Sequence, residues 1–212
     1  IMKSRKFSPH HQGWIESILD KEHINFLWDR IEDGNKFDVK DTLAGNISKS
    51  YEITDSKDRY FFNTILWPHV EMYRKINEGK DPLPIPVNAE LELYLHDLWV
   101  NYQYQTEFNP YHFHGGMYSF VIWMKIPTFW REQHELSFLD GVDVDNKKAS
   151  NFEFQYLDML GNIKNWGYRL DPSMEGHMLF FPAKLMHTVY PFFNCDEPRI
   201  SIAGNLWHRG IK

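Results

Sequence analysis

Three histidines in the second half of the sequence have the residue type and spacing of a metal site. His112 and His114 are separated by one residue, and His187 lies much further along the chain. Residues two apart in an extended chain point to the same side, so the imidazoles of His112 and His114 can converge on one point. Two ligands from one strand and a third from a distant strand would leave open positions on a metal. In a chain with 11 histidines, an accidental pair is the alternative.

A possible carboxylate-binding pair follows the third histidine. Arg199 and Ser201 share one face of a predicted strand, and isoleucines occupy the other face. If the apolar face packs on the core, the guanidinium and the hydroxyl face the interior of a barrel. An arginine with a neighbouring hydroxyl is suited to hold a carboxylate through two hydrogen bonds. The alternative is an ordinary ion pair between Arg199 and Glu197 or Asp196.

The elements that must position these residues fall into two parts. The first 80 residues predict helices over 20–31 and 56–76, with Pro68 interrupting the second. After Pro86, short aromatic and β-branched runs alternate with clusters of Gly, Pro, Asn and Asp, which is the pattern of strands and turns. The expected strands lie near 89–96, 98–106, 117–126, 135–139, 152–157, 166–170, 177–181, 186–192 and 198–207. Many short strands joined by turns are typical of a jelly roll or sandwich.

Composition limits the class of protein. The chain has 212 residues, of which 42% are apolar and 17% aromatic, so disorder is excluded and a large core is expected. A net charge of -6 argues against binding to a nucleic-acid backbone. The single cysteine, Cys195, excludes an intrachain disulfide. No apolar run is long enough for a membrane span and no secretion signal is visible, so we expect a soluble, cytoplasmic protein.

The histidines and the Arg-x-Ser pair together resemble the Fe(II)- and 2-oxoglutarate-dependent oxygenases. The resemblance covers roughly residues 98–207 and is closest to the prolyl-hydroxylase-like branch with an HxH variant. It implies a mainly β protein with N-terminal helices, built as a double-stranded β-helix (a cupin-like jelly roll). It also implies Fe(II) held by His112, His114 and His187, with Arg199 and Ser201 binding the distal carboxylate of 2-oxoglutarate, the cosubstrate.

Two further expectations rest on this resemblance. Most of the superfamily has Asp or Glu where this chain has His114, so the neutral imidazole removes one negative charge from the ligand set. Tyr104 lies on the strand that leads to the HxH motif, where many relatives place a hydrogen bond to 2-oxoglutarate. Core packing of Tyr104 is the alternative.

The predicted organisation is a single domain over 1–212, with a helical support region over 1–85 and the β core over 86–212.

Three functional hypotheses follow. The first is a dioxygenase that uses O2 and 2-oxoglutarate to hydroxylate a peptidyl or small-molecule substrate, with no catalytic residues beyond the metal ligands. The second is a cupin-type metal enzyme without 2-oxoglutarate, because Gly176, Pro182 and His187 resemble a cupin motif. The third is a non-enzymatic jelly-roll binding or structural protein. The sequence does not identify the primary substrate or the oligomeric state.

Overall fold

The computed structural model describes residues 13–33, 37–83 and 91–210, and over these residues the chain is mostly β. One set of strands comprises β1 (Ile15–Ile18), β2 (Phe37–Asp38), β3 (Lys49–Glu52), β4 (Leu91–Gln103), β6 (Tyr118–Lys125), β9 (His177–Pro182) and β11 (Arg199–Gly210). A second set comprises β5 (Asn109–His112), β7 (Asn151–Leu157), β8 (Ile163–Arg169) and β10 (Met186–Val189). The first set forms a large sheet in the order β1-β9-β6-β11-β4-β3-β2, and the second a small sheet in the order β5-β10-β7-β8. All the pairings between these strands are antiparallel, as expected for a jelly roll.

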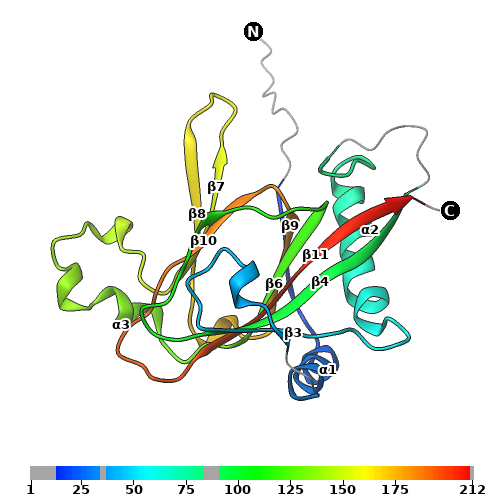
Figure 1. Ribbon diagram of the computed structural model, residues 1–212. Coiled ribbons are helices and arrows are strands. Elements are labelled where there is room, and N and C mark those ends of the chain that lie inside the picture. Colours follow the sequence, from blue (N-terminus) through cyan, green and yellow to red (C-terminus); the bar gives the residue numbers. More distant parts are fainter. Residues whose placement is uncertain (1–12, 34–36, 84–90, 211–212) are drawn as a thin grey trace, which may run out of the picture.

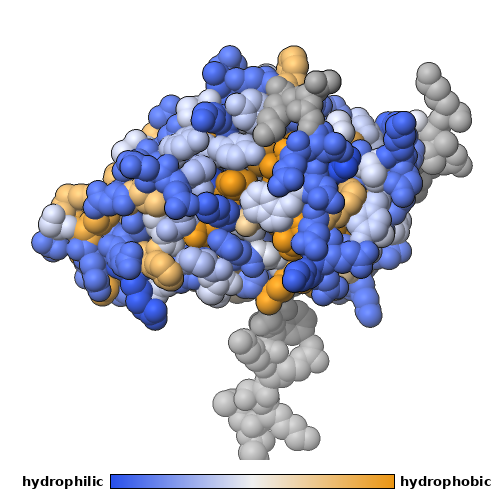
Figure 2. All heavy atoms as spheres, turned by 90° about the horizontal axis from the view of Figure 1, so that it is seen from below, coloured by the Kyte–Doolittle hydropathy of each residue, from blue (hydrophilic) through white to orange (hydrophobic). Residues whose placement is uncertain are grey.

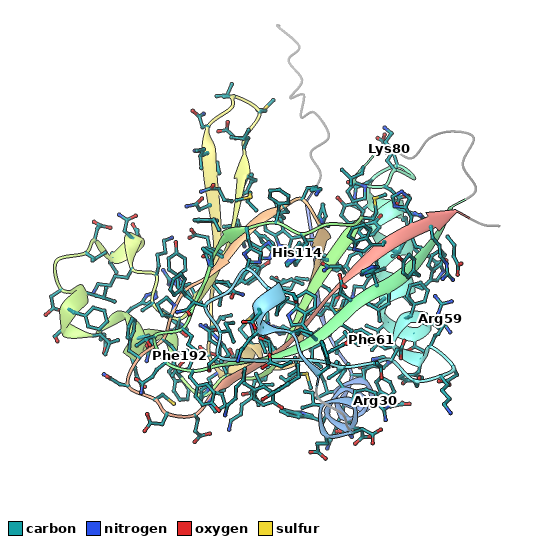
Figure 3. All side chains as sticks on the ribbon, viewed as in Figure 1. Arg30, Arg59, Phe61, Lys80, His114 and Phe192 are labelled. Atoms are coloured by element: carbon teal, nitrogen blue, oxygen red, sulfur yellow. The ribbon has the colours of Figure 1, made fainter. Side chains whose placement is uncertain are left out.

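The large sheet buries both of its faces. Neighbouring residues on β9 illustrate this, because Phe180 and Phe181 are both buried but belong to different apolar clusters. Successive strand residues point to opposite faces, so continuous apolar runs mark a strand that is covered on both sides. Phe181 packs with Phe152 and Phe154 of the small sheet, whereas Phe180 packs with the helices. The site histidines lie on the side of Phe181 (Figure 3).

Two helices cover the face of the large sheet that is turned away from the small sheet (Figure 1). Helix α1 spans Lys21–Glu32 and helix α2 spans Trp67–Ile76. A π-helical turn, Phe62–Leu66, precedes α2, and Pro68 lies in the first turn of α2. Proline has no N–H to donate, so the predicted interruption takes the form of this widened turn. Short helices complete the described chain: α3 (Trp130–His134) and the 3-10 turns Lys40–Thr42, Ser137–Leu139, Val144–Asn146 and Pro172–Met174.

Several predicted elements differ from the structure. One strand, β4 (Leu91–Gln103), replaces the two strands predicted over 89–96 and 98–106, and its pairing with β11 shifts register at Asn205/Leu206; residues 89 and 90 lie outside the described residues. The strand predicted over 135–139 is wrong, because this segment follows α3 and contains a 3-10 turn. There Gln133 exchanges hydrogen bonds with the backbone of Phe193, which holds the segment against a loop instead of a sheet. The first 85 residues are also not purely helical, since β1, β2 and β3 join the large sheet.

Within the described residues, no helix is long and apolar enough to cross a bilayer. Figure 2 shows the face seen from below, where hydrophilic residues cover most of the surface and the apolar ones form small separate patches. Scattered apolar side chains are normal on the surface of a globular protein.

Candidate metal centre

The three predicted histidines come together between the two sheets. His112 ends β5, and His187 lies directly opposite it on β10 in the antiparallel pairing of these strands. His114 follows two residues after His112, and its backbone N–H donates to the carbonyl of Ala183 at 2.8 Å. The candidate ligand atoms of the three side chains all lie within 4.8 Å of one another. Figure 3 shows His114 between the large sheet and the small sheet.

Two glycines allow the chain to turn immediately after the histidines. Gly115 and Gly116 lie against Trp207 of β11, and Gly116 has a positive φ of 84°. A Cβ at Gly116 would lie 2.6 Å from the carbonyl oxygen of Leu206, which leaves no room for a side chain. Glycine adopts this backbone conformation without steric cost. The turn therefore fixes His114 against the large sheet just before β6 begins.

Hydrogen bonds orient two of the imidazoles as metal ligands are usually oriented. Nδ1 of His112 lies 2.7 Å from the carbonyl oxygen of Pro110, and Nδ1 of His187 lies 2.9 Å from that of Leu185. A carbonyl only accepts, so in both residues Nδ1 carries the proton and the Nε2 lone pair is free. Metal-bound histidines typically make this contact with their second nitrogen. The Nε2 atoms of His114 and His187 are 3.2 Å apart, so their lone pairs meet where an ion would bind.

Burial keeps these imidazoles neutral. It lowers the pKa of His112, lowers that of His114 to about 4, and places the pKa of His187 well below its usual value. The proximity of the other imidazoles further lowers the pKa of His114 and of His187, because two neighbouring positive charges would repel each other. A neutral imidazole is the form that binds a metal. The donor set therefore fits a divalent transition metal at neutral pH.

Two adjoining cavities meet at the histidines. The inner cavity, of about 60 Å³, is lined by all three histidines together with Trp99, Asn101, Asn109, Ser201 and other residues. The outer cavity, of about 400 Å³, is lined by Val39, Thr42, Leu43, Glu52, Asp97, Leu98, Trp99, His114 and Asn205. Both cavities include Leu43, Trp99 and His114. A molecule in the outer cavity would thus lie beside one of the candidate ligands.

Arg199 is buried deeper between the sheets and is 2% exposed. Its Nε and Nη2 donate to Oε1 of Gln103, and the remaining N–H groups donate to the carbonyl of Tyr190 and to the carbonyl and hydroxyl of Ser150. Burial lowers the pKa of Arg199 to about 9, so it stays charged at neutral pH. These acceptors are all neutral, and among the described residues no carboxylate pairs with Arg199.

The carboxylates considered as alternative partners of Arg199 bind other residues. Glu197 accepts a hydrogen bond from Lys125, and Asp196 accepts one from Gln105. Arg199 packs instead over the ring of Phe192, with 5.4 Å from its central carbon to the ring centroid. In Figure 3, Phe192 and His114 are well separated in the view. Arg199 is therefore a buried cation without an anionic partner among the described residues.

The other two predicted cosubstrate residues differ in position. Ser201 lines the inner cavity, on the same face of β11 as Arg199. Tyr104 follows the end of β4, and its hydroxyl accepts a hydrogen bond from Nζ of Lys49 at 3.0 Å. Neither Tyr104 nor Arg199 is among the described residues that line the two cavities. The roles predicted for Arg199, Ser201 and Tyr104 in cosubstrate binding stay predictions.

Sequence reasoning missed several polar residues at the cavities. Asn101 pairs with Ser201 across β4 and β11, and its Oδ1 accepts a hydrogen bond from Ser50 of β3 at 2.7 Å. Asp97 and Trp99 lie further along the same face of β4. The signal for these residues was their alternation with apolar residues along β4, which identifies the face but not what the face covers.

A family model described as "Putative 2OG-Fe(II) oxygenase" matches residues 97–205, just over half of the chain. The chain therefore belongs to this family of 2-oxoglutarate-dependent Fe(II) oxygenases, whose metal is Fe(II) and whose cosubstrate is 2-oxoglutarate. The predicted class of enzyme, a 2-oxoglutarate-dependent dioxygenase, is confirmed. A comparison with curated proteins gave no match.

Three solved structures have a similar fold. A Pseudomonas putida prolyl-4-hydroxylase is 14% identical with a TM-score of 0.52, over 93% of this chain and 94% of that chain. An oxidoreductase of the 2OG-Fe(II) oxygenase family from Burkholderia pseudomallei is 9% identical with a TM-score of 0.52, over 89% and 80%. SnoN, a non-heme alpha ketoglutarate dependent epimerase from nogalamycin biosynthesis, is 12% identical with a TM-score of 0.54, over 94% and 78%. At these identities the likeness shows a shared fold.

Proposed function

We propose that His112, His114 and His187 hold Fe(II) and that this oxygenase hydroxylates a peptidyl or small-molecule substrate. The observation that carries the proposal is the convergence of three neutral imidazoles, two of them with Nδ1 bound to a backbone carbonyl. Bound Fe(II) would supply the oxidative chemistry in which 2-oxoglutarate and O2 give succinate and CO2 while the substrate is oxidised. The two adjoining sheets, which have the strand arrangement of a double-stranded β-helix, support this proposal.

The protein's part in the reaction is ligation, orientation and exclusion of water. Three neutral imidazoles supply no negative charge, so the carboxylate of the cosubstrate that is not paired with Arg199 would supply negative charge at the metal. Phe152, Phe181 and Phe154 surround His187, with ring centroids 5.8, 5.0 and 6.2 Å from its own. These rings hold the imidazole in one orientation and keep water from this side of the site.

Arg199 and Ser201 are proposed to bind the distal carboxylate of 2-oxoglutarate. The support is the buried guanidinium, whose hydrogen-bond acceptors among the described residues are all neutral. A buried cation without a counter-ion is costly, and an incoming carboxylate would compensate it. Gln103 would have to turn away to free the Nε and Nη2 donors, since its Oε1 accepts from both. We also propose that residues 1–85 support the β core and that the protein is cytoplasmic.

Anaerobic titration tests the proposal directly. Fe(II) is added to the metal-free protein with and without 2-oxoglutarate, and binding is followed by calorimetry and absorbance. We expect one Fe(II) per chain, and a weak charge-transfer band in the visible range only when 2-oxoglutarate is present. Metal binding with no band and no 2-oxoglutarate affinity at millimolar concentration would favour a cupin-type enzyme. The absence of both kinds of binding would contradict the proposal altogether.

A further inference from the structure

One face of the large sheet carries a row of polar residues that runs past the histidines. Four directly paired positions of β11 and β4 form it: Arg199 with Gln103, Ser201 with Asn101, Ala203 with Trp99, and Asn205 with Asp97. At about 3.3 Å per residue, the Arg199 end and the Asp97 end are roughly 20 Å apart. The row therefore has a cation at the buried end and an anion at the other, with the inner cavity between them.

The outer cavity lies at the acidic end of this row. Its volume of about 400 Å³ falls in the range of small-molecule sites, and it adjoins the inner cavity at Trp99 and His114. The described residues that line it include two acidic side chains, Asp97 and Glu52, and neither lysine nor arginine. A compound in this cavity would meet two carboxylates while lying beside a candidate metal ligand.

The Asp97 carboxylate is held in place by a buried chain of hydrogen bonds. Asn205 donates to Oδ2 of Asp97 at 3.0 Å, and the hydroxyl of Ser119 donates to the Oδ1 of Asn205 at 2.6 Å. Asn205 is 6% exposed and Ser119 is 1% exposed. Nδ1 of His96 lies 2.6 Å from Oδ1 of Asp97. Each carboxylate oxygen can accept a second hydrogen bond, so both still have capacity for a ligand.

The nearest lysine on the inner side has a partner of its own. Lys40 lines the inner cavity, and its Nζ lies 3.3 Å from a carboxylate oxygen of Asp38. Lys184, which follows the strand β9, lies over the ring of Phe113 at 4.7 Å from the centroid. Neither lysine lines the outer cavity in the described part of the chain, so the local charge there is negative.

A second, independent observation points to a ligand. Trp99 is 6% exposed, lines both cavities, and has an indole N–H without a hydrogen-bond partner among the described residues. A buried donor without a partner is costly and uncommon in native proteins. A ligand acceptor, such as a carbonyl or carboxylate oxygen, would satisfy it. The combination of an acceptor near Trp99 and a cation near Asp97 describes a compound that contains both groups.

We propose that the outer cavity is the primary-substrate site and that it selects substrates with a protonated amine or guanidinium group. The cation would bind Asp97, assisted by Glu52, and the rest of the molecule would extend past Trp99 toward His114. Charge recognition of this kind disfavours neutral analogues, because they leave the carboxylate of Asp97, whose side chain is 41% exposed, without a cationic partner from the substrate. This inference rests on the proposed function, since it takes the histidines as the reaction centre.

Matched pairs of compounds test the charge preference. The pairs are Nα-acetyl-lysine amide with Nα-acetyl-norleucine amide and Nα-acetyl-arginine amide with Nα-acetyl-citrulline amide, each as the small molecule and within a short capped peptide, so that only the side-chain charge differs. Binding to protein loaded with Mn(II) and 2-oxoglutarate is measured by calorimetry, and succinate release is measured with Fe(II). We expect the cationic member of a pair to bind at least about tenfold more tightly and to stimulate succinate release more. Small compounds and peptides present the same side-chain cation, so the set that binds shows whether the substrate is a small molecule or a peptide.

Variants locate the preference in the cavity. Asp97→Asn keeps the shape of the side chain, and should weaken binding of the cationic compound roughly 10- to 100-fold, or about 1.4 kcal/mol for each factor of ten. Glu52→Gln should weaken it less. Binding of the neutral twin should change less than about threefold. The control variants Asp140→Asn and Glu132→Gln remove exposed carboxylates outside the cavity and should leave every affinity unchanged.

The outcomes distinguish failure of the substrate inference from failure of the proposed function. If the wild type binds Mn(II) and 2-oxoglutarate but prefers no cationic compound, or if Asp97→Asn and Glu52→Gln both bind it as the wild type does, the substrate inference is overturned and the proposed function stands. The inference is equally overturned if no cationic compound binds at millimolar concentration. If the wild type binds neither Mn(II) nor 2-oxoglutarate, the proposed function itself fails.

Discussion

His187 and His112 lie directly opposite each other across β10 and β5, with their ring centroids 4.3 Å apart. The pairing of two strands therefore sets the distance between these two candidate ligands, and a loop does not. A slip of one residue in this pairing would turn one imidazole to the other face of the sheet. The same two strands are joined by Thr188, whose hydroxyl donates to the backbone carbonyl of Asn109 at 2.7 Å.

Replacement of either of these histidines should abolish metal binding. We expect His112→Ala and His187→Ala to retain less than about a tenth of the metal bound by the wild type, since each would leave two donors. The measurement is elemental analysis after dialysis against limiting Fe(II) or Mn(II). His208→Ala removes an exposed imidazole near the end of β11 and serves as the control. Stoichiometric metal in His112→Ala or His187→Ala would count decisively against the assignment.

Two substitutions at position 114 test whether His114 binds the metal. His114→Asp restores the carboxylate found in most of the superfamily and should keep or strengthen Fe(II) binding, because it adds a negative charge beside the metal. His114→Leu removes the donor and should lose at least about tenfold in affinity. Calorimetric titration of both variants with Mn(II) measures the difference. Unchanged affinity in His114→Leu would leave only two protein donors at the site.

Removal of the Arg199 guanidinium should weaken cosubstrate binding more than metal binding. Truncating one partner of a buried charge pair costs about 2–5 kcal/mol, which corresponds to a rise of roughly 30- to 3,000-fold in the dissociation constant of 2-oxoglutarate for Arg199→Ala. Arg199→Lys should fall between, because it keeps the charge and loses the planar fork. Calorimetry on the Mn(II)-loaded protein measures both.

A stability control is needed for Arg199, because Gln103, Ser150 and Tyr190 also lose their donor. We expect a lower melting temperature in Arg199→Ala, while Mn(II) affinity without 2-oxoglutarate stays within about threefold. Arg209→Ala, which removes an exposed partner of Glu92, is the matched control. Wild-type affinity for 2-oxoglutarate in Arg199→Ala would remove Arg199 from the cosubstrate site.

Glu153 should support the metal centre from the outer face of the small sheet. It is fully buried and accepts hydrogen bonds from Tyr111 at 2.5 Å and from Lys148 at 2.6 Å. Tyr111 directly precedes His112, so this contact helps to hold β5. Lys148 is 30% exposed, so we discount the cost of breaking a buried pair and expect Glu153→Ala to lose about 2–4 kcal/mol of unfolding free energy.

Urea unfolding of the metal-free protein measures this loss, and Mn(II) titration measures the effect on the site. Glu153→Gln keeps an acceptor and should lose less than Glu153→Ala. Glu132→Gln, on the exposed side of α3, should change nothing. A Glu153→Ala variant as stable as the wild type would show that Tyr111 and Lys148 find other partners.

The pH dependence of stability should include a contribution from His69. Burial lowers the pKa of His69, whose Nδ1 lies 2.6 Å from the carbonyl of Ile65 and whose Nε2 lies 2.9 Å from the hydroxyl of Ser17. The unfolded value is about 6.5, so the unfolded chain binds the proton more tightly. Stability is therefore unaffected above pH 6.5 and falls as the pH drops toward the lowered folded value.

The measurement is the difference in unfolding free energy between pH 8 and pH 5 for the metal-free protein. His69→Gln keeps a polar side chain that does not titrate, and this difference should be smaller in the variant than in the wild type. His208→Gln is the exposed control. An identical pH difference in wild type and His69→Gln would contradict the prediction.

The sequence predicted the elements with strong patterns. The long aromatic strands β6, β9 and β11 carry enough apolar and β-branched residues to be found without a structure. The four-residue strands β1, β3 and β5 do not, because so short a segment cannot display a period. β1 and β3 form because a longer neighbour, β9 or β4, offers unpaired backbone groups, whereas β5 pairs with β10, which is itself four residues long. All three pairings are tertiary effects.

The histidines of the candidate site could be predicted from the sequence, but the hydrogen-bond partners around them could not. The HxH spacing predicted that the imidazoles of His112 and His114 lie on one side of an extended segment, and His187 was predicted as the third ligand, from a distant strand. In the structure β5 ends at His112, so His114 lies just beyond the strand. The partners of Arg199 could not be predicted, since Gln103 and Ser150 lie far from it in sequence and Tyr190 contributes only its backbone carbonyl. Backbone acceptors leave no mark in an amino-acid pattern. Asp97 and Asn205 could not be recognised as a pair either, because their pairing depends on the register of β4 and β11.

The row of paired residues on β4 and β11 also bears on how the protein folds. Hydrogen-bonded partners in this row, Arg199 with Gln103 and Asn205 with Asp97, are 96 and 108 positions apart in the chain. Ser119 and Asn205 are 86 positions apart. Contacts between such distant segments form slowly, because a long loop must close before any of them is made. The last strand, β11, contributes Arg199, Ser201 and Asn205 together, so neither cavity is complete until it has inserted between β4 and β6. During synthesis, a chain that stops short of β11 would carry all three histidines and still lack one wall of both cavities.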